Sequence, residues 1–243
     1  MTSFKNLIYT AFIISLFFSC ENDSDTNFIL KGNVKNLKKG VLYLQKDGKS
    51  TIINLDSVVV KGEPNFELKA NIEEPVLLYL KLQKNDGQEH YIPFFADKGI
   101  TEINTTLKGF SSAAKIKGSK QQVVLEAYQE LMTDFKNKNL DLLKANFEAV
   151  KRKDTTTTDS LYKQSERLLR LKYASIINYA LNNKDSEVAP YLALYEIPNT
   201  SAKYLDSIYN NLKPDIKASF YGKKLGKVLS DFKIAQDSIK WGF

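Results

Sequence analysis

The sequence has very few residues of the kinds that build covalent or metal-centred sites. Its 243 residues include one cysteine, one histidine, one tryptophan and two methionines. A single cysteine excludes an internal disulfide, a CxxC redox pair and a thiolate zinc site. A single histidine, His90, cannot supply a histidine metal cluster, and we find no Ser/His/Asp triad around it. We therefore expect a fold that depends on core packing alone, with no metal or cofactor.

Arginine and long apolar runs are also scarce. The net charge of +7 comes mostly from lysine, because Arg152, Arg167 and Arg170 are the only arginines. Nucleic-acid readers favour arginine for bidentate base contacts, and the lysines here are spread along the chain. We expect them to form solvated faces, with no nucleic-acid partner. No run approaches the roughly 20 apolar residues of a membrane-spanning helix.

The N-terminus does contain an ordered set of signals. The cationic Lys5, the apolar run Leu7–Phe18 and the small residue Ser19 directly precede Cys20. These are the parts of a secretory signal peptide, here residues 1–19, whose apolar region is typically about 7–15 residues long. A cysteine just after the cut resembles a bacterial lipoprotein lipobox. The alternative is a plain secretory signal that leaves a cysteine near its cleavage site.

The lipobox resemblance implies that Cys20 carries lipid, because its thiol can be alkylated with a diacylglycerol. Stable anchoring takes more than one acyl chain. The expected location is the cell envelope, at the outer membrane of a Gram-negative cell, on its periplasmic or surface face. Residues 20–27 would form the lipidated tether. The acidic stretch Glu21–Asn27 is either a solvated leader or a surface-export signal.

Short β-rich runs separated by turn signals occupy residues 28–118. Asp47-Gly48 and Asn85-Asp86-Gly87 are hairpin signals. The expected strands are Phe28–Val34, Val41–Gln45, Thr51–Val60, Phe66–Ala70, Val76–Leu82, His90–Phe95 and Thr101–Leu107. Seven or eight such strands predict an antiparallel β-sandwich or open barrel.

A helical period begins at Ser119, which is a good N-cap residue. The polar run Lys151–Thr158 is expected to form a loop before a long helix that starts at Asp159 or Ser160. The other expected helices are residues 119–137, 140–150, 187–195, 201–212, 214–219 and 222–231. The fold class is therefore α+β, with an all-helical domain over residues 119–243.

Several short segments resemble a β-rich domain of unknown function in lipoproteins that carry a C-terminal thioredoxin-like disulfide oxidoreductase. They are Phe28–Gly32, Leu55–Ser57, Phe66 after a turn, Pro93–Ile100 and Gly118-Ser119. The resemblance covers most of residues 27–240. It implies an anchored β domain followed by a helical segment. No CxxC is present, so the redox activity of such relatives does not carry over.

Candidate site residues are few. Asp56-Ser57 lies in an apolar strand, where a carboxylate needs a hydrogen-bond donor. We interpret the Asp56 carboxylate as making either a structural hydrogen bond or a contact with a ligand. Phe94 and Phe95 point to opposite faces of one strand, so one is expected in the core while the other could line a partner surface. Glu73 and Glu74 are not expected to act as an acid/base pair on one substrate bond, because adjacent residues of a strand also point to opposite faces. The turn residues Asp47, Asp86 and Asp97 lack the spacing of a calcium loop.

Three functions remain open. The first is a non-enzymatic binding or scaffold lipoprotein that engages an unidentified envelope protein or small ligand. The second is an accessory to envelope thiol-disulfide chemistry that works with a separate thioredoxin-like protein; it rests on the resemblance alone. The third is a hydrolase that uses carboxylates and tyrosines.

Overall fold

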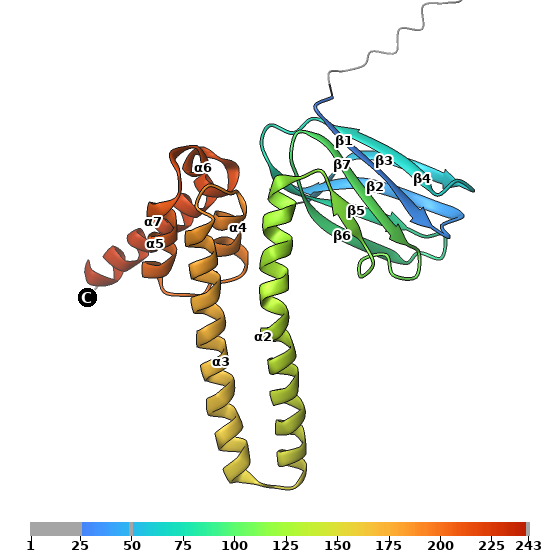
Figure 1. Cartoon of the computed structure of the whole chain (residues 1–243). Helices are drawn as coiled ribbons and strands as arrows, with labels where there is room; N and C mark the ends of the chain where they lie inside the picture. The colour runs from blue at the N-terminus through green and yellow to red at the C-terminus, as the bar shows by residue number, and fades with distance from the viewer. Residues whose placement is uncertain (1–25, 49–50, 242–243) are drawn as a thin grey trace, which may run out of the picture.

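The computed structural model describes residues 26–48 and 51–241, with side chains as far as residue 235. Two four-stranded sheets come first and helices follow (Figure 1). The strands are β1 (Phe28–Lys35), β2 (Lys39–Asp47), β3 (Ile52–Lys61), β4 (Asn65–Ala70), β5 (Val76–Gln83), β6 (Glu89–Ala96), β7 (Gly99–Thr106) and β8 (Lys115–Lys117). The predicted α+β class is confirmed, and the sandwich does not close into a barrel. The short strand β8 was not predicted.

The two sheets have the strand orders β4-β1-β7-β8 and β3-β2-β5-β6. The prediction of a wholly antiparallel sandwich is wrong at one place, because β1 runs parallel to β7. At this pair a Cβ on Gly32 would lie only 1.9 Å from the carbonyl oxygen of Ile103. The close approach of the two strands therefore requires glycine at this position.

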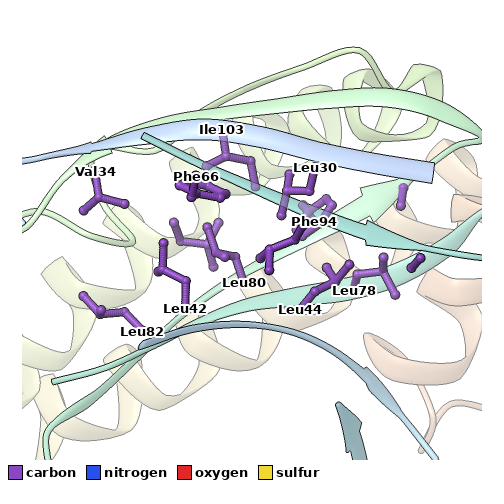
Figure 2. Close-up of a cluster of buried hydrophobic side chains, with 14 of the residues drawn as sticks. Leu30, Val34, Leu42, Leu44, Phe66, Leu78, Leu80, Leu82, Phe94 and Ile103 are labelled. Atoms are coloured by element: carbon purple, nitrogen blue, oxygen red, sulfur yellow. The ribbon is translucent and has the colours of Figure 1, made fainter. Parts of the chain in front are cut away.

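The sandwich core lies between the two sheets (Figure 2). Alternate residues of each strand point into it, as the period of two in a strand requires. Figure 2 shows Leu30 and Ile103 of one sheet facing Leu80 and Phe94 of the other. These side chains are fully buried, so apolar packing in the core holds the two sheets together.

The helices are α2 (Lys120–Lys151), α3 (Thr155–Asn182), α4 (Val188–Tyr195), α5 (Ala202–Asn211), α6 (Pro214–Ala218) and α7 (Phe220–Trp241). Helices α2 and α3 form a long antiparallel hairpin, and α4–α7 gather beside the part of it nearest the sandwich (Figure 1). The two helices predicted for residues 119–137 and 140–150 are one continuous helix, α2. The polar residues between them lie on its solvated face, where no apolar side chain is needed.

The predicted loop over residues 151–158 is also wrong, because the chain reverses within three residues. Lys153 adopts a positive φ of 57°. Asp154 then caps α3, its carboxylate accepting hydrogen bonds from the Thr157 amide at 3.0 Å and the Thr157 hydroxyl at 2.7 Å. A capping aspartate offsets the low helix propensity of the four threonines that follow, so the helix begins at Thr155.

Candidate functional site

An aromatic cluster joins the sandwich to the helices. Phe95 of β6 is fully buried and points away from the sandwich core into the helical core. Its ring lies 5.3 Å from that of Tyr191 and 5.7 Å from that of Tyr221, both in edge-to-face arrangements. The Tyr221 hydroxyl accepts a hydrogen bond from the Leu77 amide of β5 at 3.1 Å. The partner surface predicted for one of the two phenylalanines is thus formed by the chain's own helices.

Burial shifts the tyrosines of this cluster toward the neutral form. Removal from water raises the pKa of Tyr191 to about 12 and that of Tyr221 higher still, because ionisation would leave a charge in an apolar setting. The rings pack against one another and against Phe95. They fill the junction between sheet and helices, so these aromatic side chains serve as part of the hydrophobic core.

Polar contacts at the start of α2 secure the same junction. Ser119 accepts a hydrogen bond from the Gln122 amide at 3.0 Å, as predicted for an N-cap. Asp97, in the turn after β6, accepts from the amides of Lys120 at 2.5 Å and Gln121 at 3.2 Å. The Gln122 side chain accepts from the Phe95 amide at 2.9 Å. The exposed amides at the helix N-terminus are thereby tied to the sheet.

Replacing Asp97 with alanine is expected to lower the free energy of unfolding by about 1–2 kcal/mol, because two amides at the start of α2 lose their acceptor. Urea denaturation followed by circular dichroism measures the change. Asp86→Ala is the matched control, since Asp86 accepts from the Gln88 amide within an exposed hairpin turn. A loss no larger than that of the control would show that Asp97 does not stabilise the junction.

A buried carboxylate, Glu187, lies where α4 meets the start of α7. Its side chain accepts a hydrogen bond from the Ser219 hydroxyl at 2.6 Å. The pKa of Glu187 is raised to about 7, chiefly by burial; the Ser219 hydrogen bond opposes the rise, and the charges of Glu74, Asp215 and Asp97 add to it. Glu187 therefore titrates near neutral pH instead of near 4.5.

Two shallow hollows lie on the described surface. One of about 500 Å³ is lined by Glu73, Glu74, Asp97, Lys98 and Lys120 among others. Its Glu74 accepts from the Phe220 amide at 2.9 Å at the start of α7, and its Asp97 caps α2, so both have structural partners. The other, of about 810 Å³, is lined by lysines and valines of β2 and β3. In the described part of the chain, no three His, Cys, Asp or Glu residues are grouped to hold a metal ion.

The remaining predicted candidates are dispersed. Asp56 accepts from the amides of Ser57 and Lys69, each at 2.7 Å, which agrees with the structural interpretation. Asp47 accepts from the Tyr79 hydroxyl at 3.1 Å. His90 lies on β6 with its ring 6.2 Å from that of Phe110. Cys20 lies outside the described residues. Among those residues, no helix is both long enough and apolar enough to cross a membrane.

The end of the α2–α3 hairpin exposes large apolar side chains. We name this surface the distal apolar face: Leu140, Leu143, Phe147 and Val150 of α2, with Tyr162 and Leu169 of α3. Each is at least half exposed, and Phe147 is 68% exposed. The sequence pattern shows these residues as a helical stripe, and such a stripe normally predicts burial. What it could not show is that α4–α7 do not reach this part of the hairpin.

In the comparisons with known proteins, a family model matches the first part of the described chain. Residues 28–125 match the family model of a domain of unknown function, DUF4369. The DUF4369 region covers the sandwich and the first turns of α2. It agrees with the predicted domain of unknown function, and nothing in the match points to a lipoprotein or a thioredoxin-like neighbour. No curated protein matches the chain.

Solved structures add little. One that matches is a 9R-lipoxygenase from Cyanothece PCC8801, with 16% sequence identity and a TM-score of 0.22. The alignment covers 32% of this chain and 16% of the lipoxygenase chain. The chain therefore aligns with only a small part of that enzyme.

Proposed function

We propose that this protein is a membrane-anchored binding or scaffold module, held in the cell envelope by lipid on Cys20, with the α2–α3 hairpin as its partner-binding arm. The distal apolar face carries the proposal. Contiguous apolar surface of this kind on a soluble part of a protein marks an interaction site. The DUF4369 region then acts as a rigid base, since Phe95, Asp97 and Tyr221 fix the helices to it.

The Cys20 anchor has its own support. The only thiol of the chain directly follows an apolar run and a small residue, which is the position that lipid attachment needs. In Figure 1 the chain enters the sandwich through β1, and the end of the hairpin points away from that entry. An anchored protein would thus present the distal apolar face on the side of the molecule away from the start of β1.

The test places a photo-crosslinking amino acid at Phe147 in cells that make the full chain. The matched control carries it at Val59, which is also exposed but lies on β3 of the sandwich. We expect a defined crosslinked product from position 147 and none from position 59. Equal crosslinking from both positions, or none from position 147, would contradict the binding role.

The same cells with Cys20→Ala test the anchor. Membrane fractionation is expected to find the wild-type chain with the membrane and the variant released from it, because several acyl chains on one residue are lost together. If the partner lies at the membrane, the yield of the crosslinked product from position 147 should also be lower in the Cys20→Ala variant. A variant that stays in the membrane fraction would contradict lipidation of Cys20.

A further inference from the structure

The distal apolar face continues surfaces that the protein covers nearer the sandwich. Val150 follows the buried Met132 by eighteen residues, which is five helical turns, so both point to the same side of α2. On α3, Leu169 and Tyr162 precede the buried Ile176 by seven and fourteen residues and share its side. Met132 and Ile176 belong to one core cluster with α4. The two exposed strips therefore lie on the side of the hairpin that α4 packs against.

Helix α4 shows that a short apolar helix can pack on this side of the α2–α3 hairpin. It is short, it contacts both α2 and α3, and Val188, Ala189, Leu192 and Ala193 are all buried. It ends at Tyr195, and Glu196 after it lies near Tyr128 of α2. On α2 the apolar cluster that includes α4 extends through Met132 to Phe135, and the next large apolar residue, Leu140, is half exposed. Beyond that point the same two helices continue without a third. The uncovered strip from Leu140 to Val150 is about 15 Å long, which matches about three turns of helix.

The borders of the exposed strip on α2 are basic. Lys136, Lys144 and Lys151 lie one turn from Leu140 and Phe147, on the same side of the helix. Among the described side chains, in residues 26–48 and 51–235, no carboxylate lies within 4.0 Å of these three lysines. Residues 134–173 hold ten lysines and arginines and six acidic residues, a net charge of +4, and include every arginine of the chain. A second copy would bring like charges together, whereas an acidic partner would be attracted.

We infer that the distal apolar face binds one amphipathic α-helix of a partner protein, which packs its apolar side on α2 and α3 and carries acidic residues along its flanks. The inference rests on the proposed function and specifies its partner. The bound helix takes the place, further along the hairpin, that α4 takes near the sandwich. Burial of the six apolar side chains supplies the affinity, and the lysines select an acidic partner over a basic one.

Two synthetic peptides of about 18 residues test the inference. Both carry leucines at helical spacing; one has glutamates on its flanks and the other has lysines in their place. The protein is the chain from residue 20 onward with Cys20→Ala, which keeps every described residue, and binding is measured by fluorescence anisotropy. We expect the acidic peptide to bind, the basic peptide to bind at least about tenfold more weakly, and added salt to reduce the difference.

Matched variants locate the site. Leu169→Glu is expected to weaken binding of the acidic peptide by at least about tenfold. Leu171→Glu is the control, because Leu171 is 52% exposed, Leu169 is 50% exposed, and the two lie on nearly opposite sides of α3. The double variant Lys144→Glu, Lys151→Glu should reverse the preference and favour the basic peptide. Misfolding could not produce that reversal.

Several results would overturn the inference. Equal binding of both peptides, or equal loss with Leu171→Glu, would exclude this surface as a selective helix site. Sedimentation that finds a dimer abolished by Leu169→Glu would make a second copy the occupant. Flotation with anionic phosphatidylglycerol vesicles that the same variant abolishes would make it a lipid surface. If neither peptide binds but crosslinking from position 147 persists, the hairpin is still a binding arm and only the inference of a helical partner is wrong. If the peptides do not bind and position 147 gives no crosslink, the proposed function is wrong as well.

Discussion

Replacing Phe95 with alanine is expected to lower the free energy of unfolding by about 3–5 kcal/mol, the usual loss for a buried phenylalanine. The ring lies between β6 and the helices and contacts Tyr191 and Tyr221. Its removal leaves a cavity that the rigid sheet cannot close, and the edge-to-face contacts disappear with it. Urea denaturation followed by circular dichroism measures the loss.

Phe94→Ala is the matched control for this prediction. Phe94 is the preceding residue of the same strand, is equally buried, and points into the sandwich core (Figure 2). Both variants should lose similar total stability, but hydrogen exchange should separate them. Phe95→Ala should speed exchange in α4 and α7 first, and Phe94→Ala in the strands. Unchanged exchange in the helices of Phe95→Ala would show that Phe95 does not couple the two parts.

The second large effect is a pH dependence that Glu187 imposes on stability. Its pKa is about 7 in the folded protein, above the ordinary value of 4.5 expected in the unfolded chain. The folded state therefore binds the proton more tightly. Stability from the protonated carboxyl is fully present below about pH 4.5 and is lost as the pH rises through about 7. The loss builds up between about pH 4.5 and pH 7, is complete above about pH 7, and amounts to about 3 kcal/mol.

Glu187→Gln should remove this loss, because an amide is neutral at every pH. Near pH 4.5 the variant and the wild type should be about equally stable, and at about pH 8.5 the variant should be more stable by about 3 kcal/mol. Asp215→Asn, which removes one of the neighbouring charges, should move the wild-type transition to lower pH. Parallel stability curves for wild type and Glu187→Gln across this range would contradict the assignment.

The local elements could be predicted from the sequence, because their signals are local. Asp47-Gly48 and Asn85-Asp86-Gly87 separate strands whose pairing is set by short turns. Ser119 marked the start of α2 correctly. Asp154 did not guide the prediction of α3, because the threonines after it have low helix propensity and favour a loop on composition alone.

The long-range arrangement could not be predicted in the same way. Parallel pairing of β1 with β7 joins residues about seventy positions apart and leaves no local pattern. The apolar stripe through Leu143 and Phe147 has the period of a buried helix face, and only the positions of α4–α7 show that it is uncovered. Glu187 stands in an ordinary polar stretch before Val188, and its burial follows from how α7 returns to the sheet.

The position of β1 also determines when the sandwich can form. Strand β1, the first of the described strands, lies inside its sheet, between β4 and β7, and needs both neighbours to satisfy its backbone. A chain that emerges from the N-terminus onward has β1 available from the start but cannot pair it on both sides until Thr106 has followed. Such non-local pairing delays folding. The order of strands therefore delays completion of this sheet until the segment that forms β7 is available, although β1 comes before the other described strands in the sequence.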